Sequence, residues 1–415
     1  MNLGKGNGIL VLCVEKCIFA LTLCVRKCND SMISCVEKCN DSMISCVEKC
    51  NELAFLCVEK CKDMKRKIYD QLLEWKSQEH HKPLILNGVR QCGKTYVLKE
   101  FGRREFESLA YVSCDRNVNL QAIYSGDFDV ARIIQGLSAL TGVDIIPGKT
   151  LIFLDEVQAF PQALEALKYF CEDAPEYHIA VAGSLLGVAL HAGISFPVGK
   201  VQTMRLFPMD FEEFLMAMGE EQLLKLMHSH DYELMNAFHE KLKDLLRQYY
   251  YVGGMPEVVK AFVENKLLNQ VRSLQNEILS NYASDFSKHA PSQEVPRIDM
   301  VWQSILGQLS KENKKFVYGV LKKGGRAKEF ELAIQWLVDA GLVYKITKVS
   351  KPELPLKFYE DLSAFKLYLC DCVLMGAMAD TPAKEVLLGD TIFTEYKGAF
   401  SEQYVLQQLL ATGLQ

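Results

Sequence analysis

The hydrophobic pattern between residues 82 and 183 predicts strands that alternate with helices. Three short apolar runs are typical of strands: Pro83–Leu86, Leu151–Leu154 and His178–Ala182. A run with little or no polar interruption suits a central parallel strand covered on both faces. Residues 161–172 repeat apolar positions at helical spacing between the second and third runs, so right-handed crossovers are expected. The predicted fold class is therefore α/β, a parallel sheet with helices on both faces.

The pattern changes to helical spacing after residue 211. Residues 212–248 are rich in Leu, Met, Glu and Lys at that spacing, which predicts a helical lid or linker. From Val301 the pattern predicts two or three short helices, a Lys-rich turn at 322–328, a helix at 330–340 and a strand at 342–349.

The first 63 residues carry a repeat of period 11 that contains ten of the fifteen cysteines, in pairs from Cys13/Cys17 to Cys57/Cys61. An 11-residue period keeps each pair on nearly the same stripe of a helix. Three interpretations stay open: a metal or redox stripe, a long helix or coiled coil, and a translated tandem repeat upstream of a start at Met64. We expect residues 1–63 to be dispensable for the folding and the ligand binding of the rest of the chain, since ordinary non-repetitive sequence begins at Met64.

Composition and charge narrow the class of protein. Apolar residues make up 49% and charged residues 24% of the chain, as in globular proteins, and the net charge is −5. That charge gives no global basic field for nucleic acid. No apolar run approaches the ~20 residues of a transmembrane helix, because Glu15 and Lys16 interrupt the best candidate. The expected location is the cytoplasm, with reduced cysteines.

The first predicted strand leads into a glycine-rich motif, GVRQCGKT, at residues 88–95, and then into a helical segment. This is the context that a phosphate-binding P-loop, the Walker A motif, requires. Gly88 and Gly93 let the backbone wrap around phosphate, and the helix N-terminus favours the anion. Lys94 then reaches the β- and γ-phosphates, and Thr95 offers a hydroxyl to magnesium. The predicted nucleotide contacts in this motif are Gly88, Val89, Arg90, Gln91, Cys92, Gly93, Lys94, Thr95 and Tyr96.

The second predicted strand ends in two acids, Asp155 and Glu156, like a Walker B motif. Open α/β sheets bind their ligands at the carboxyl ends of the strands, so Asp155 is expected to hold Mg²⁺ with Thr95. Glu156 is placed to orient and deprotonate the attacking water. The third strand ends at Ser184, which could sense the γ-phosphate. The predicted cofactors are ATP and Mg²⁺, and the predicted catalytic residues are Glu156, Lys94 and Ser184.

The series GVRQCGKT, LIFLDEVQAFP, VAGSLLG, FPVGKVQTMRLFPMDFEEFL and YVGGMPEVV resembles a family of prokaryotic AAA-type ATPases. The resemblance runs from Met64 to the end and implies a P-loop NTPase sheet, a helical lid and a winged-helix-like domain. The implied bounds are 64–215 for the ATPase domain, 216–290 for the lid or linker, 291–375 for the winged-helix-like domain, and 376–415 for the start of an incomplete PD-(D/E)xK nuclease-like region.

The resemblance implies further roles for a few residues. Gly253, Gly254 and Pro256 look like an element that related ATPases place near the nucleotide base, although Gly254 and Pro256 could equally punctuate two helices. Arg205 could complete a neighbouring subunit's site in a homo-oligomer, or be a surface residue. Glu402 would be the first acid of the nuclease-like region. Its later acids and lysine have no counterpart before Gln415, so nuclease activity is not expected.

One segment departs from the family pattern. Asp371-Cys372-Val373 stands where the family usually has Asp-Val-Gly, which puts a glycine-dependent turn there in doubt.

Two functions remain open from the sequence. The first is an ATPase whose hydrolysis drives a conformational change that acts on DNA or a protein partner. The second is a non-enzymatic nucleotide-dependent switch or scaffold with negligible turnover. A basic stretch could meet a DNA backbone, could serve a protein partner, or could be a solvated face; it comprises Lys311, Lys314, Lys315, Lys322, Lys323, Arg326 and Lys328.

Overall fold

The computed structural model of the 415-residue chain describes residues 64–115, 117–126, 128–184, 187–188, 196–311, 315–388 and 391–413. The chain divides into two units, Met1–Asp63 and Met64–Gln415, and only the second is described below. All predictions for the cysteine repeat lie outside the described residues.

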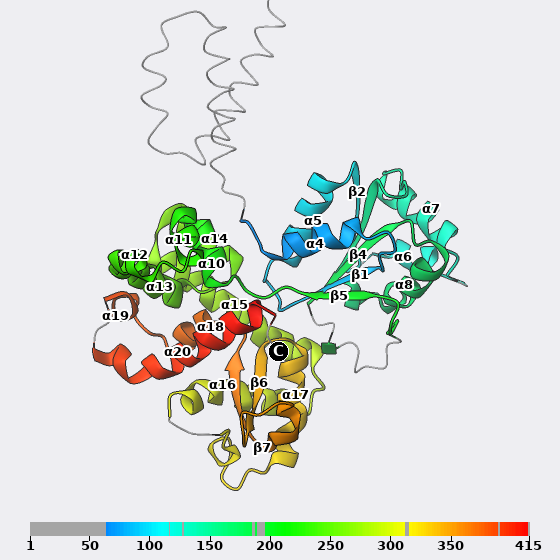
Figure 1. The fold of residues 1–415 in the computed structure, drawn as a ribbon. Coiled ribbons are helices and arrows are strands. Elements are labelled where there is room, and N and C mark those ends of the chain that lie inside the picture. The colour runs from blue at the N-terminus through cyan, green and yellow to red at the C-terminus, as the bar shows by residue number, and fades with distance from the viewer. Residues whose placement is uncertain are drawn as a thin grey trace, which may run out of the picture. The chain divides into compact units, whose positions relative to one another are not determined.

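Five parallel strands form one sheet in the first part of the described chain (Figure 1). Their order is β2-β3-β4-β1-β5, so β1 lies between β4 and β5 in the sheet. The strands are β1 (Leu84–Asn87), β2 (Ser108–Ser113), β3 (Thr150–Asp155), β4 (His178–Gly183) and β5 (Gln202–Arg205). Every residue of β3 and β4 is buried, as expected for apolar runs in the centre of a covered sheet.

Helices cover both faces of the sheet, which confirms the predicted fold class. Leu84 and Leu86 of β1 pack in one core with the buried side chains of α4 and α5, whereas Ile85 packs in a second core with those of α6, α7 and α8. This division follows from the alternation of side chains along a strand. The helices are α4 (Ile68–Ser77), α5 (Lys94–Glu105), α6 (Asn119–Ile123), α7 (Val130–Thr141) and α8 (Pro161–Asp173).

Two stacked histidines pack beneath the first core. The rings of His81 and His178 lie 3.7 Å apart between centroids, and both meet Trp75 edge-on. Burial, and then the charge of protonated His81, lower the pKa of His178 to about 4. Burial also lowers the pKa of His81.

We expect this pair to make the fold sensitive to acid. Because the unfolded chain takes up protons near pH 6.5 and the folded His178 only near pH 4, the free energy of unfolding should fall as the pH is lowered through that window. Urea unfolding at several pH values measures this decrease, and a His178→Phe variant should show a flatter profile. Equal slopes for both proteins would contradict the assignment.

Six helices follow the sheet, in the region predicted to be a helical lid. The buried Asp210 and Glu213 form a reciprocal capping box at the start of α10. The helices are α10 (Phe211–Met218), α11 (Glu221–His228), α12 (Tyr232–Ala237), α13 (His239–Val252), α14 (Pro256–Asn265) and α15 (Leu268–His289).

A helical pair and a two-stranded antiparallel hairpin follow, in a winged-helix-like order that confirms this part of the fold prediction. The elements are α16 (Val295–Leu309), the short 3-10 helix η2 (Tyr318–Val320), α17 (Ala327–Asp339), β6 (Val343–Val349), the 3-10 helix η3 (Leu356–Tyr359) and β7 (Glu360–Leu369). The amide of Phe316 adds a 2.7 Å hydrogen bond to the carbonyl of Phe365.

Three helices end the described chain: α18 (Cys372–Met378), α19 (Ala383–Leu388) and α20 (Thr391–Ala411). The backbone of Val373 is helical and Asp371 caps α18, so this segment forms without a glycine. Gln403 of α20 accepts from the amide of Leu369 and donates to its carbonyl, which ties α20 to the end of β7. The Glu402 carboxylate accepts bonds from Lys366 and Tyr368 of β7.

None of the helices in the described part of the chain is long and apolar enough to cross a membrane. Over the same residues, no cluster of three or more His, Cys, Asp or Glu side chains could hold a metal ion. The cytoplasmic location, the domain bounds and the homo-oligomer stay predictions.

Candidate nucleotide site

The predicted P-loop lies between β1 and α5, at the carboxyl edge of the sheet. Gly93 has φ of 97°, a left-handed conformation that favours glycine, and Gln91 has φ of 67°. The side chains of Val89 and Cys92 are buried in the core, so only their backbone groups could meet a nucleotide. Tyr96, in the first turn of α5, is 46% exposed.

Lys94 lies inside the loop that precedes it. Its ammonium group donates to the carbonyls of Gly88 and Val89 at 2.8 and 2.9 Å, and its side chain is buried. A buried cation enclosed by a glycine-containing loop is placed to meet phosphate oxygens.

Thr95 and Asp155 meet although 60 residues separate them. The Thr95 hydroxyl donates to Oδ2 of Asp155 at 2.8 Å, because α5 begins beside the carboxyl end of β3. Tyr111 of β2 donates to the same oxygen at 3.3 Å. Burial, and then the charge of Asp155, raises the pKa of Tyr111. A hydroxyl and a carboxylate side by side are the oxygen donors that Mg²⁺ prefers, so these residues fit the predicted ion.

Glu156 follows β3 in a left-handed conformation with φ of 51°. Such a conformation is uncommon for residues other than glycine and clusters at functional sites. The Nε2 group of Gln158 donates a hydrogen bond to the Glu156 carboxylate. The Oε1 atom of Gln158 lies 2.6 Å from the position that a Cβ atom on Gly183, at the end of β4, would occupy. Gln158 therefore links Glu156 to the strand end that carries Ser184, a residue whose side chain is buried.

Pro256 begins α14 and lies beside the P-loop. The position that a Cβ atom on Gly93 would occupy is 3.4 Å from Cγ of Pro256. The predicted site residues thus gather at one edge of the sheet.

Two family models match parts of the chain. Residues 80–215 match the family described as AAA domain, and residues 243–385 match a family described as Domain of unknown function (DUF8612). Residues 80–215 are an AAA domain. The P-loop, Asp155, Glu156 and Ser184 all fall within it, which confirms the predicted resemblance to AAA-type ATPases.

Several solved structures are similar to this chain at a low level. A Walker-type ATPase of Pyrococcus abyssi has a TM-score of 0.48 and 13% identity, covering 76% of this chain and 96% of that one. The ORC1 protein of Aeropyrum pernix, solved with DNA, has a TM-score of 0.31 and 15% identity, covering 76% and 91%. RuvB of Thermotoga maritima has a TM-score of 0.29 and 14% identity, covering 67% and 87%. No curated protein matches the sequence. At this level of similarity, the function must be argued from the chain's own residues.

Arg66 binds the P-loop of the AAA domain through the backbone of Cys92. No sequence motif predicted this role. The guanidinium of Arg66 donates to the carbonyl of Cys92 at 2.8 Å and to the carbonyl of Phe207 at 2.5 Å. It also forms an ion pair of 3.1 Å with Glu213 of α10, and both side chains are less than 10% exposed. Arg66 therefore joins the P-loop, the end of β5 and α10 at one point.

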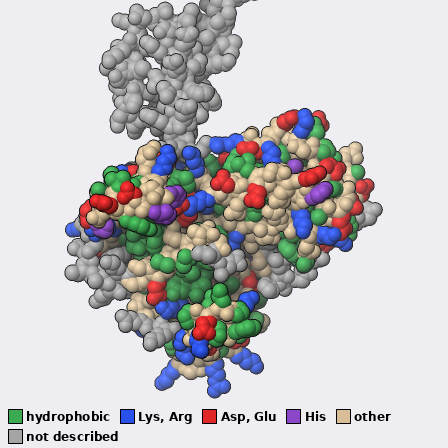
Figure 2. Space-filling view, viewed as in Figure 1, with side chains coloured by type: hydrophobic (Ala, Val, Ile, Leu, Met, Phe, Trp, Pro, Cys, Tyr) green, Lys and Arg blue, Asp and Glu red, His purple; other side chains and the backbone are tan. Residues whose placement is uncertain are grey.

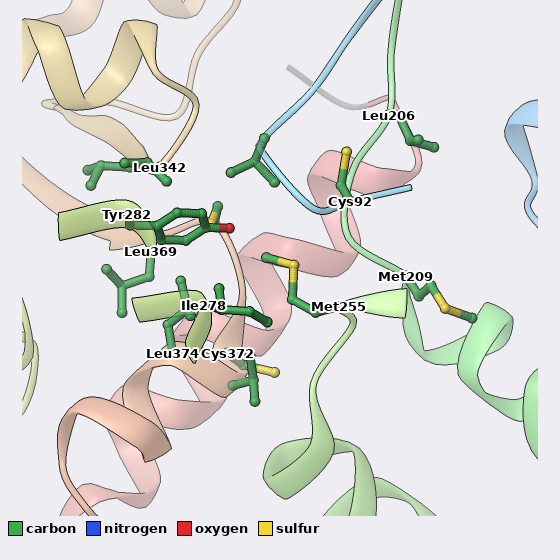
Figure 3. Packing of buried hydrophobic residues seen from close by; sticks show 14 of the residues in the cluster. Cys92, Leu206, Met209, Met255, Ile278, Tyr282, Leu342, Leu369, Cys372 and Leu374 are labelled. Carbon is green, nitrogen blue, oxygen red and sulfur yellow. The ribbon is translucent and has the colours of Figure 1, made fainter. Parts of the chain in front are cut away.

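The region after the AAA domain also contacts the P-loop. The hydroxyl of Tyr282 in α15 donates to the carbonyl of Arg90 at 3.0 Å, and the side chain of Arg90 forms an ion pair with the buried Asp285. Figure 3 shows Tyr282 with its hydroxyl turned toward the loop that carries Cys92. Gly341, which follows α17, lies against Val89.

Arg205 lies at the end of β5 and does not extend freely from the surface. Its guanidinium lies 5.2 Å from the ring centres of both Phe207 and Tyr344, the latter in β6 of the same chain. A role in a neighbouring subunit's site stays a prediction, and this position instead connects the AAA domain to the hairpin.

Gly254 is held between Met209, which precedes α10, and Asp371, which caps α18. A Cβ atom at this position would lie 2.1 Å from the carbonyl oxygen of Met209, so only glycine fits. Its amide donates to the carboxylate of Asp371 at 2.8 Å, and its carbonyl accepts from the amide of Met209 at 2.7 Å. Burial raises the pKa of Asp371 to about 6. This contact sets the start of α14 and hence the place of Pro256.

Proposed function

We propose that this protein binds ATP with Mg²⁺ and hydrolyses it, and that hydrolysis changes the contacts between the P-loop and the region after the AAA domain. The observation that carries the proposal is the close grouping of Lys94, Thr95 and Asp155 at the edge of the sheet that Glu156 and Ser184 also reach. This is the set of groups that phosphoryl transfer to water needs.

Each residue has a separate role in the proposed reaction. Lys94 exchanges its bonds to the Gly88 and Val89 carbonyls for bonds to the β- and γ-phosphates of the substrate. Glu156 takes a proton from the water whose oxygen bonds to the γ-phosphorus, and ADP leaves as the bond between the γ-phosphorus and the bridging oxygen of the β-phosphate breaks. Ser184 donates to a γ-phosphate oxygen. Thr95 and Asp155 would hold Mg²⁺, which would neutralise charge on the phosphates.

The contacts of Arg90 support the proposed coupling. Its carbonyl is bound by Tyr282 and its side chain by Asp285, both on α15. A change in the backbone of the P-loop on ATP binding would therefore alter these contacts with α15 directly. Coupling between two regions needs a contact that differs between two states, and we propose that the bonds of Arg90 to α15 are contacts of this kind.

Duplex DNA is the partner class we propose for the winged-helix-like region. Residues 315–369 contain ten Lys and Arg against six Asp and Glu, although the whole chain carries a net charge of −5. A local excess of positive charge favours binding to phosphate backbones.

Replacing Glu156 with Gln tests the proposed hydrolysis. We expect phosphate release to fall by about 100-fold or more while ATP binding is retained, because Gln cannot accept the proton from water. Phosphate release and ATP affinity are measured on the full chain. Glu176→Gln serves as the matched control, since Glu176 is exposed and precedes β4 at the opposite edge of the sheet.

The same variant separates the two functions. Equal, near-zero rates for wild type and Glu156→Gln, with ATP bound by both, would favour a non-enzymatic switch. Because the variant holds ATP unhydrolysed, it also tests the coupling. Hydrogen exchange in α15 should differ with and without ATP, and no difference would contradict the coupling through Arg90.

A further inference from the structure

The connection between β6 and β7 exposes an unusual set of apolar side chains. Residues 350–358 are all exposed. Leu354 is 88%, Phe358 is 84% and Leu362 is 70% exposed. We refer to residues 348–362 as the hairpin tip. Large apolar side chains gathered on one projecting loop mark a binding surface more often than scattered single ones do.

Positive charges surround these side chains. Lys348, Lys351 and Lys357 are exposed within the tip, and Lys351 lies over the ring of Tyr359 at 6.0 Å. Lys315 also lies near the tip, since its charge and that of Lys348 lower the pKa of Asp361, after the hydrogen bonds from Ser363. In Figure 2, Lys and Arg side chains project at the lower end of the view, where Figure 1 labels β7.

The acids of the tip are engaged within the hairpin. Glu353 accepts from the hydroxyl of Tyr359 at 3.0 Å, and Glu360 accepts from the hydroxyl of Thr347. Asp361 accepts from the amide and hydroxyl of Ser363. These bonds hold the carboxylates close to the hairpin, while the lysines of the tip remain exposed.

The chemistry of the tip favours duplex DNA over other partners. A stable protein interface buries roughly 800 Å² on each side, far more than three side chains offer. A membrane surface is usually met by an amphipathic helix, whereas the tip has only the four-residue η3. Proteins that enter the minor groove insert Phe, Leu or Pro between base steps and place Lys or Arg beside the phosphates. The tip supplies Leu354, Pro355 and Phe358 for the first role and its lysines for the second.

We propose that the hairpin tip is a wedge for the minor groove of duplex DNA. Leu354 and Phe358 enter between neighbouring base pairs and unstack them, and Lys348, Lys351 and Lys357 bind the flanking phosphates. This inference rests on the proposed DNA partner, but not on ATP hydrolysis.

The test uses the full chain and a 30-base-pair duplex with 2-aminopurine at a flexible TA step. Wild type should bind and raise the 2-aminopurine fluorescence, which reports unstacking. The double variant Leu354→Ala/Phe358→Ala should lose this rise and bind about 10-fold more weakly, because the apolar side chains that enter the base step are removed. Both side chains are exposed, so the melting temperature should not change.

Two further variants separate charge from insertion. Lys351→Ala/Lys357→Ala should keep part of the fluorescence rise but make the slope of log affinity against log salt about 2 units shallower, because each phosphate contact contributes about 0.9. Val118→Ala/Val198→Ala is the matched control, because it removes two exposed apolar side chains from the AAA domain and should change nothing.

The outcomes distinguish the two proposals. If wild type binds DNA but the Leu354→Ala/Phe358→Ala variant gives the same fluorescence rise, the wedge is wrong and the DNA partner stands. If wild type does not bind the duplex at low salt, with or without ATP, both the wedge and the DNA partner are wrong, and a protein partner for the tip becomes the better explanation. The result for Glu156→Gln is independent of either outcome.

Discussion

Replacing Lys94 with Ala should abolish measurable ATP hydrolysis, with a loss of about 100- to 1,000-fold in rate. The ammonium group of Lys94 lies inside the P-loop, where it donates hydrogen bonds to the carbonyls of Gly88 and Val89. Ala leaves the phosphates without that cation at the moment charge develops on them. ATP should also bind more weakly, so the rise in melting temperature that saturating ATP gives wild type should be lost.

Lys168→Ala is the matched control for this experiment. Lys168 is exposed on α8, and its removal should leave both the rate and the ATP-dependent shift in melting temperature unchanged. A Lys94→Ala protein that hydrolyses ATP at the wild-type rate would show that the P-loop is not the reaction site.

The strands that carry the site could be predicted because they are buried on both faces, so their consecutive residues are apolar. β3 and β4 are buried at every position, and the sequence shows this as unbroken or nearly unbroken apolar runs. The position of Asp155 at the end of β3 then follows from counting. Its contact with Thr95 was also predictable, since parallel strands bring their carboxyl ends to one edge.

The other two strands gave no such signal. β5 has the sequence QTMR, in which only Met204 is buried, because this strand lies at the edge of the sheet and pairs with β1 alone. β2 alternates between partly buried and buried residues and pairs with β3 only. Edge strands take their conformation from a neighbour that is distant in sequence, so local hydrophobicity does not reveal them.

The residues that hold the P-loop in place could not be predicted either, because their partners are also distant in sequence. Arg66 reaches Glu213 across 147 positions, and Asp285 reaches Arg90 across 195. No local pattern records such pairings, and Arg66 looks from the sequence like one of several basic residues near Met64. The site is therefore predictable in its catalytic groups and not in the contacts that fix them.

Replacing Arg66 with Ala should destabilise the protein by about 3–5 kcal/mol in free energy of unfolding, the range expected when one partner of a buried ion pair is removed. The variant leaves the Glu213 carboxylate buried without its cation, and removes the donor to the carbonyls of Cys92 and Phe207. Urea unfolding measures the loss. Arg103→Ala is the control, because Arg103 is 64% exposed in its pair with the partly buried Glu100, and such a pair should contribute less than about 1 kcal/mol.

A second variant separates the effect of the buried charges from the effect of losing side-chain volume. Arg66→Met/Glu213→Leu replaces both charges with apolar side chains, so no buried charge is left without a partner. We expect it to be more stable than Arg66→Ala, since exchanging a whole buried pair for apolar residues is often neutral. The two carbonyls would still lack their donor, so some loss relative to wild type should remain. If Arg66→Ala lost no more stability than Arg103→Ala, Arg66 would not anchor the P-loop, and the junction between β5 and α10 would have to be held by other contacts.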